Sequence, residues 1–169
     1  VVLFERERFP RFHIGESLLS TANEAFAELG VADRMAAASF PEKWGARLYT
    51  HDGRAGRGVD FAIVTEVAQS KTLQVHRGEF DRILLERARE LGVEVREGVR
   101  VTGCDFEADG VRIASESAAA APSAVRVRAL VDATGRAGLL AKRFALRTDE
   151  LGLANVAIFA HYSGVPRLP

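Results

Sequence analysis

The sequence contains few of the residues that build disulfide frameworks, metal sites or membrane spans. Its 169 residues include one cysteine, Cys104, and four histidines that are widely separated along the chain. A single cysteine forms no internal disulfide, and separated histidines make no recognisable ligand cluster, so we expect a reducing, cytoplasmic setting and no metal. No apolar run approaches the roughly 20 residues that a transmembrane helix needs. We therefore expect no membrane span.

The charge shows no excess of either sign. The chain carries 23 basic and 23 acidic side chains, and 47% of its residues are hydrophobic. This balance is ordinary for a globular domain and does not indicate a nucleic-acid or anionic-lipid partner. A chain of this length corresponds to about one domain and can bury roughly 70% of its unfolded surface.

A glycine-rich phosphate-binding turn of the form G-x-G-x-x-G is also missing. The segment GRAGRG, residues 53–58, lies between predicted strands and opens no helix, so it predicts a turn instead. The first residues, VVLFER, have the pattern of a strand already in progress. We therefore expect that a segment precedes them in the natural protein.

The chain alternates between strand and helix patterns. Val1–Phe4 predict a buried parallel strand that ends at Glu5. A helix is expected from Leu18 to Leu29, capped either by Ser17 or by a Thr21–Glu24 capping box. The best-defined helix follows Arg77 and ends at Gly92, with an expected apolar stripe of Phe80, Ile83, Leu84, Arg87, Ala88 and Leu91.

The remaining segments predict mostly strands. Residues 44–51, 59–65 and 72–77 predict short strands with an antiparallel hairpin, and Ala108–Gly110 predicts a hairpin turn between two later strands. Small residues over 116–124 predict a loop. The last elements expected are a strand at 125–135, a short helix at 139–144 and a strand at 153–164. The order predicts an α/β sheet interrupted by an antiparallel element.

Three features point to a nucleotide. Glu5, at the end of a parallel strand, is placed to accept hydrogen bonds from the two hydroxyls of an adenosine ribose, with a solvated charge as the alternative. The segment VDATGRAG, residues 131–138, predicts a turn whose free amides approach a phosphate or ring system, or else an ordinary strand-to-helix turn. Arg77 can reach a phosphate or ribose, or it can pair with Glu79 or Asp81.

Together these segments resemble a known family. FERERFPRFHIGESLL (4–19), EKWGARL (42–48), VHRGEFDRILLERARELGVEV (75–95) and VDATGRAGLLAKRF (131–144), in this order and spacing, resemble the FAD-dependent oxidoreductases of the flavin-dependent (tryptophan) halogenase group. That group is related to aromatic hydroxylases and geranylgeranyl reductases. The resemblance implies an incomplete FAD/NAD(P)-binding Rossmann-like fold of the glutathione-reductase type with an inserted antiparallel β element, and it implies FAD as the cofactor.

The resemblance also implies roles for individual residues. Glu5 would bind the adenosine ribose, Arg77 would contact FAD near its ribose or phosphates, and the backbone at Val101 would border the adenine. The flavin-facing motif would be Gly15, Glu16 and Ser17, and the inner turn would be Ala133, Thr134 and Gly135. His13 receives no role.

Lys43 is the expected catalytic residue. The group carries a lysine at this place, where it faces the substrate and positions hypohalous acid or forms a haloamine. An ammonium suits this work because it is a compact donor whose pKa falls when it is desolvated. The alternative is a structural or surface lysine, since relatives with other activities keep a similar Lys-x-Gly-Ala pattern.

The implied organisation is a partial FAD-binding domain over residues 1–169. Residues 1–40 would hold the second strand and the flavin-facing loop and helix, 41–76 the substrate-facing strands, 77–150 the helix and return strands, and 151–169 the next strand region. The chain lacks the Trp-x-Trp-x-Ile-Pro segment associated with halogenases. The parent would oxidise an electron-rich small molecule with FAD and oxygen, supplied with reduced flavin by a separate reductase. The alternatives are a hydroxylase, a reductase of isoprenoid double bonds, or an inactive truncated module.

Overall fold

The computed structural model describes residues 1–64, 70–148, 156 and 158–164. These residues divide between two compact units, Val1–Val127 and Arg128–Pro169. Each unit is considered by itself. Within the described residues, no helix is both long enough and apolar enough to cross a lipid bilayer.

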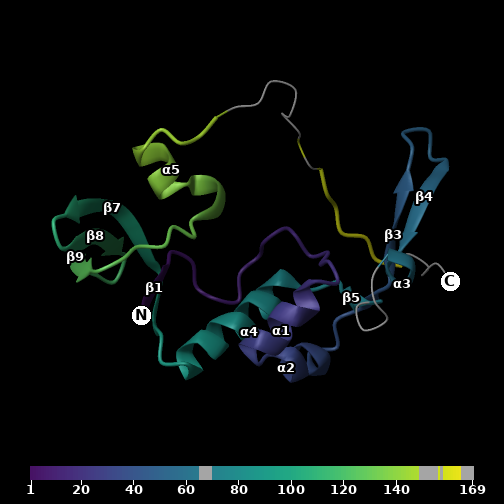
Figure 1. The fold of residues 1–169 in the computed structure, drawn as a ribbon, viewed down its shortest axis with the longest axis horizontal. Helices are drawn as coiled ribbons and strands as arrows, with labels where there is room; N and C mark the ends of the chain where they lie inside the picture. The colour runs from purple at the N-terminus through teal and green to yellow at the C-terminus, as the bar shows by residue number, and fades with distance from the viewer. Residues whose placement is uncertain (65–69, 149–155, 157, 165–169) are drawn as a thin grey trace. The chain divides into compact units, whose positions relative to one another are not determined.

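The first unit is a mixture of short strands and helices (Figure 1). In chain order its elements are β1 (Val2–Glu5), α1 (Ala22–Leu29), α2 (Ala32–Ala37), β2 (Glu42–Lys43), β3 (Gly45–Tyr49), β4 (Ala55–Asp60), α3 (Phe61–Val64), β5 (Thr72–Leu73), α4 (Arg77–Glu90), β6 (Glu94–Glu97), β7 (Val99–Glu107), β8 (Gly110–Ser117) and β9 (Ala120–Val127).

The N-terminal strand forms the parallel pair expected of an α/β fold. β1 pairs with β6 in parallel, so that Val2 lies opposite Glu94 and Glu5 opposite Glu97. The connection between them passes through the helices, as a parallel crossover requires. β1 is only partly buried along its whole length. Glu5 therefore stands at the carboxyl end of a parallel strand, where α/β folds place their ligands.

A small apolar core joins three helices to β5. Its buried members are Phe26, Val31, Met35, Phe40, Val75 and Ile83. α1 ends at Gly30, whose left-handed φ of 66° turns the chain so that the fully buried Val31 enters this core. Phe26 and Phe80 meet edge to ring at a centroid distance of 6.0 Å, which packs α1 against α4.

Three antiparallel sheets complete the first unit, the smallest of which pairs β2 with β5. β3 and β4 form a hairpin, and β7, β8 and β9 form a meander in that order. The inner face of the meander buries Cys104, Val111 and Ile113. Alternation along β8 explains this burial, because every second side chain points to the same face.

In the second unit, the residues that the structure describes form one 3₁₀ turn and one short helix. A 3₁₀ turn covers Gly135–Ala137, and α5 covers Leu139–Arg143. The short helix expected at 139–144 is thereby confirmed. The strand expected at 153–164 lies partly outside the described residues, and the described residues 156 and 158–164 form no strand.

Several local predictions were wrong. α1 begins at Ala22 without a side-chain cap from Thr21, and Ser17 makes a β-bridge to Gln74 instead of capping the helix. Phe61–Val64 are helical and not part of a strand, because the Asp60 carboxylate accepts the Ala62 amide at 2.9 Å and starts a turn.

Other differences concern strand limits and one helix stripe. The small residues at 116–124 do not form a long loop, since β9 already begins at Ala120 and Ser115 contacts Ser123 across the strands. β9 then ends at Val127, so the expected strand at 125–135 is mostly irregular. Leu91 lies beyond the end of α4 and is 61% exposed, whereas Leu85 is buried. α2 had not been predicted.

Candidate functional site

The segment Gly15–Ser17 lies as an added strand beside β5. The Leu18 amide donates to the Leu73 carbonyl at 3.2 Å, and the Val75 amide donates to the Glu16 carbonyl at 2.8 Å. Ser17 and Gln74 form the β-bridge between these two hydrogen bonds. Gly15 precedes this pairing with a φ of 102°, which side chains rarely adopt. The packing of β5 on the apolar core therefore holds the segment Gly15–Ser17 in place.

Arg77, the first residue of α4, holds the Gly15 turn from the helix side. Its Nη1 donates to the Ile14 carbonyl at 2.8 Å and to the Gly15 carbonyl at 3.4 Å. Its Nε and Nη2 donate to the two carboxylate oxygens of Asp81 at 2.9 and 3.1 Å. Of the two acids considered as partners, Asp81 is the one that pairs with Arg77. This pair is 10–20% exposed and is not a surface pair.

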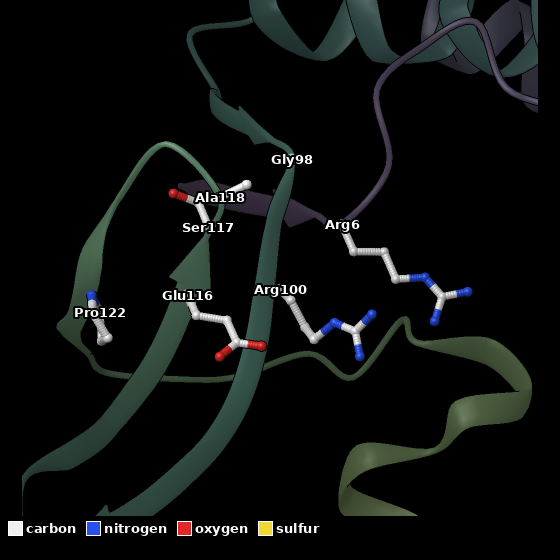
Figure 2. Close-up of a pocket in the computed structure, with 7 residues that line it drawn as sticks. All are labelled: Arg6, Gly98, Arg100, Glu116, Ser117, Ala118 and Pro122. Carbon is white, nitrogen blue, oxygen red and sulfur yellow. The ribbon is translucent and has the colours of Figure 1, made fainter.

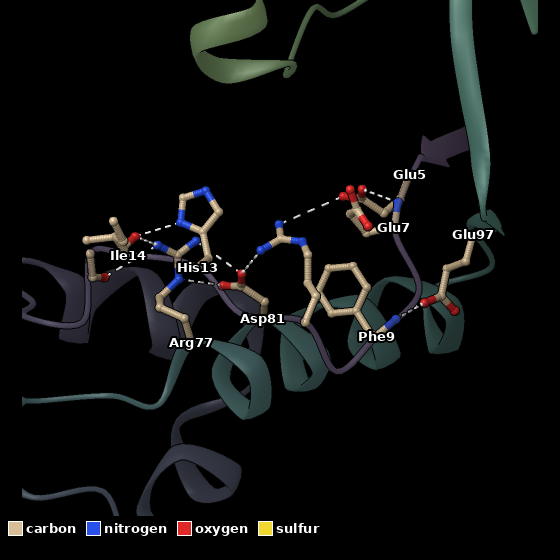
Figure 3. A network of polar contacts seen from close by, with 10 residues as sticks. Glu5, Glu7, Phe9, His13, Ile14, Arg77, Asp81 and Glu97 are labelled. Atoms are coloured by element: carbon tan, nitrogen blue, oxygen red, sulfur yellow. Dashed lines mark hydrogen bonds and ion pairs between the residues drawn. The ribbon is translucent and has the colours of Figure 1, made fainter. Parts of the chain in front are cut away.

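A second arginine, Arg11, connects the same aspartate to the end of β1. Its Nη1 donates to Asp81 Oδ2 at 3.0 Å, and its Nη2 lies 3.9 Å from Glu5 Oε2. The other Glu5 oxygen accepts the Glu7 amide at 2.8 Å. Figure 3 shows this network running from Glu5 to the turn at Ile14. The structure thus brings together Glu5, Arg77 and the Gly15 turn, which are far apart in sequence.

Lys43 reaches the same loop from β2. β2 pairs with β5, placing Lys43 opposite Thr72. The Lys43 ammonium donates to the Leu18 carbonyl at 3.0 Å and lies 5.1 Å from the centre of the Phe61 ring. The predicted catalytic lysine is therefore hydrogen-bonded to Leu18, the residue that follows the predicted flavin-facing motif.

An open cleft lies beside the carboxyl end of β1. Its volume is about 430 Å³, and it is lined by Arg6, Gly98, Arg100, Glu116, Ser117, Ala118 and Pro122. Figure 2 shows the side chains of Arg6 and Arg100 extending in the same direction. These two residues adjoin Glu5 and Val101 in sequence. The β7–β8 register shifts between Val101 and Gly103, an irregularity of the kind that re-aims backbone groups near binding sites.

The second unit carries the Ala133–Gly135 turn, which is organised by Asp132. One oxygen of Asp132 accepts the Thr134 amide at 2.9 Å and the Thr134 hydroxyl at 2.6 Å, and the other accepts the Leu140 amide at 2.8 Å. The hydroxyl of Thr134 and the amides of Leu140 and Thr134 hold the pKa of Asp132 below its ordinary 3.8. The exposed Gly135 has a φ of 58°, and no atom lies within 4 Å of where a Cβ would stand. Space for a ligand is therefore open at this turn.

Sequence reasoning missed Arg11 and Asp81 as members of the first site. Arg11 lies within residues 4–19, one of the segments that resemble the family. Asp81 follows Arg77 by four residues, the spacing of a helical ion pair. Neither of these sequence features predicts that Asp81 pairs with both Arg11 and Arg77. His13 is exposed, its Nδ1 lying 2.6 Å from the Ile14 carbonyl, and its role stays open. Among the described residues no group of acids, histidines and cysteine could hold a metal ion.

Each unit, considered by itself, exposes groups of the kind that bind nucleotides. Glu5 offers a carboxylate at a strand end, and the Gly15 and Gly135 turns each place backbone without a side chain at the surface. Comparison with known proteins agrees with this chemistry. Residues 11–159 match the family described as the FAD binding domain.

Individual relatives come from one enzyme group. The chain is 34% identical to the 1H-pyrrole-2-carbonyl-[peptidyl-carrier protein] brominase of Pseudoalteromonas luteoviolacea (strain 2ta16), over 99% of this chain and 40% of that protein. It is also 34% identical to a flavin-dependent halogenase of Armillaria mellea, over 99% of this chain and 34% of the relative. The chain thus spans well under half the length of these relatives.

A solved structure shows the same fold. A flavoprotein/dehydrogenase of Cytophaga hutchinsonii matches with a TM-score of 0.79 and 30% sequence identity, over 88% of this chain and 37% of the other. These similarities confirm the α/β FAD-binding fold that was expected and the cofactor that was expected with it. The chain belongs to the FAD binding domain family, it is similar to flavin-dependent halogenases, and its cofactor is FAD.

Proposed function

We propose that this chain serves the oxidation of an electron-rich organic substrate by FAD and oxygen, with halogenation as the reaction. The observation that carries the proposal is the hydrogen bond from Lys43 to the Leu18 carbonyl. It fixes a half-buried ammonium against the segment that begins at Gly15. The relatives' names, a brominase and a halogenase, say which chemistry such an arrangement serves in those proteins.

The proposed cofactor contacts follow the two ends of the network. Glu5 would accept the hydroxyls of the adenosine ribose through its Oε2, which Arg11 Nη2 approaches at the long distance of 3.9 Å. The adenine would lie in the neighbouring cleft, close in sequence to Val101, where the register of β7 and β8 shifts. Gly15, Glu16 and Ser17 would border the flavin, with Arg77 behind them. When bound, FAD supplies the oxidation–reduction chemistry.

The second unit would contribute the inner turn. Ala133, Thr134 and Gly135 are exposed and would offer backbone groups to the same cofactor. Asp132 would fix their shape through the three hydrogen bonds that it accepts.

Lys43 would act as a proton donor. Its ammonium would hydrogen-bond the oxygen of hypohalous acid, and the substrate ring would attack the halogen. The proton given up by Lys43 Nζ would make the departing oxygen leave as water, and the ring would then lose the proton of the substituted carbon. Such positioned acids typically contribute about 10²- to 10⁴-fold to a rate.

A hydroxylase or a double-bond reductase is the second candidate, because the Lys43 ammonium already has structural contacts. A lysine that donates to the Leu18 carbonyl and lies over the Phe61 ring could serve the stability of the fold without taking part in the reaction. An inactive module is the third, since this chain contains no G-x-G-x-x-G turn to anchor the pyrophosphate. A separate flavin reductase and a cytoplasmic location stay predictions.

Bromination by the natural gene product tests the proposal. The protein is given reduced FAD, oxygen, bromide and electron-rich aromatics, including a pyrrole thioester, and products are identified by mass spectrometry. We expect brominated products, a loss of about 100-fold or more in Lys43→Met, and no loss in Lys71→Met. Lys71 is a matched control, because it too lies over an aromatic ring, that of Trp44, but it is exposed and pairs with Glu42 on the surface.

Two results would count against the proposal. Hydroxylated or reduced products without bromination, formed equally well by Lys43→Met, would favour the second candidate. The inactive-module reading has its own check, since the purified 169-residue chain retaining one FAD per molecule would exclude it.

A further inference from the structure

Asp81 is the one carboxylate that both arginines of the site share. It lies in the second turn of α4 with a side-chain exposure of 10%. Both of its oxygens accept hydrogen bonds from Arg77, and Oδ2 accepts one more from Arg11. Charge-assisted hydrogen bonds of this geometry are among the stronger ones in proteins, and low exposure limits their screening by salt.

Arg77 and Arg11 connect Asp81 to different parts of the segment from Glu5 to Gly15. Through Arg77 it fixes the carbonyls of Ile14 and Gly15. Through Arg11 it approaches the carboxylate of Glu5, at the end of β1. The backbone around Arg11 also lies against the start of α4, where a side chain at Gly78 would come within 3.2 Å of the Arg11 carbonyl. The helix is therefore a platform for the whole segment from Glu5 to Gly15.

The charges explain why the aspartate is needed. Arg11 and Arg77 bring two guanidinium groups to one carboxylate, and guanidinium stays protonated at any ordinary pH. Without the negative charge of Asp81 the two cations would repel each other. Their nearest remaining acceptors would be Glu5 and backbone carbonyls.

We infer that Asp81 is the positioning residue that holds both ends of the cofactor-facing segment, the Glu5 end and the Gly15 end, in one geometry. This inference rests on the proposed contacts of Glu5 and Gly15 with FAD. Asp81 itself would touch neither the cofactor nor the substrate. It acts through Arg11 and Arg77, so its loss weakens FAD binding by loosening both ends together.

The first test is cleavage by trypsin, carried out on the natural gene product without FAD. Trypsin must take the Arg11 side chain, which Asp81 holds, whereas Arg54, in the turn between β3 and β4, is 86% exposed and lies outside the segment from Glu5 to Gly15. In Asp81→Asn we expect the ratio of cleavage after Arg11 to cleavage after Arg54 to rise about tenfold, the effect of losing a charged hydrogen bond. A ratio removes changes in overall stability from the comparison.

The matched control is Glu86→Gln. Glu86 lies on the same helix and pairs with Arg82 in the same i, i+4 manner, but at 42% exposure and away from the loop. We expect this control to leave the cleavage ratio unchanged. In the FAD-loaded protein, the dissociation constant for FAD should rise about tenfold in Asp81→Asn and stay within about twofold in Glu86→Gln.

The outcomes distinguish the role of Asp81 from the proposed function. An unchanged cleavage ratio in Asp81→Asn, or an equal rise in Glu86→Gln, would overturn the inference. If Asp81→Asn does not fold, Asp81→Glu is scored in the same way, since it keeps the charge but moves it by one methylene. A wild-type protein that binds no FAD would overturn the proposed function, whereas the cleavage ratio would still decide the role of Asp81.

Discussion

Two aspartates, each beside a glycine turn, organise their surroundings by different physical means. Asp81 supports the Gly15 turn through ion pairs with Arg11 and Arg77, and the Arg11 bond spans 70 residues of sequence. Asp132 supports the Gly135 turn through bonds to Thr134 and Leu140, at most eight residues away. The Asp81 ion pairs therefore depend on the tertiary fold, whereas the hydrogen bonds of Asp132 form between residues that are close in sequence.

The difference predicts different responses to mutation. Bonds that join distant segments are lost together when the fold opens, so their removal reduces the stability of the whole unit. Local capping bonds re-form whenever the short helix forms and act mainly on its fraying. The changes below test this contrast, beginning with the largest expected effect.

Arg77→Met should have the largest effect on the first unit. It leaves Asp81 with Arg11 alone and removes the donor from the Ile14 carbonyl. We expect the free energy of unfolding, measured with denaturant, to fall by about 2 kcal/mol, between the value for an exposed pair and that for a buried one. The control Arg82→Met should cost under about 1 kcal/mol. Equal losses would mean that the Asp81 network adds nothing beyond a surface pair.

Gly15→Ala should weaken FAD binding and stability together. The new Cβ would stand 3.0 Å from Arg77 Nη1, at a φ of 102° that alanine rarely adopts. We expect a loss of about 1 to 2 kcal/mol in stability and a higher dissociation constant for FAD. Gly53→Ala is the control, since its φ of 78° is also strained but no atom lies within 4 Å. It should lose stability without losing FAD affinity.

Asp132→Ala should act locally. Loss of the cap over α5 is expected to cost about 1 kcal/mol, seen as a roughly fivefold faster hydrogen exchange at Leu140. The amides of α4 should exchange as before. Faster exchange in both units would contradict the local character of this turn.

The pH dependence of the Asp132 turn should be small and confined to acid. Because the pKa of Asp132 is lowered in the folded state, its contribution is present above the ordinary pKa of 3.8 and is lost as the pH falls through the folded value. Nuclear magnetic resonance titration of the Asp132 carboxyl carbon should give a midpoint below 3.8. Thr134→Val should raise that midpoint, since the Thr134 hydroxyl is the largest cause of the shift.

Prediction from sequence succeeded where the signal was local. The apolar spacing and Gly92 gave α4 nearly to the residue, and Ala108–Gly110 gave the β7–β8 turn. It failed where neighbouring strands decided the outcome. Ser17 has the chemistry of a helix cap, but the strand β5 beside it offered a β-bridge. Pro122 and small residues favoured a loop, yet an edge strand tolerates proline because one side needs no donor.

From the sequence alone, the resemblance indicated the family and FAD, and the segment 131–138 indicated a turn, because each of these depends on motifs whose residues lie close together. Only the tertiary structure showed that Asp81 is shared by Arg11 and Arg77, and that the Lys43 ammonium lies against the Leu18 carbonyl. The physical reason is that ion pairs and hydrogen bonds between distant segments depend on the packing of α1, α2, α4 and β5. No spacing along the chain encodes that packing directly.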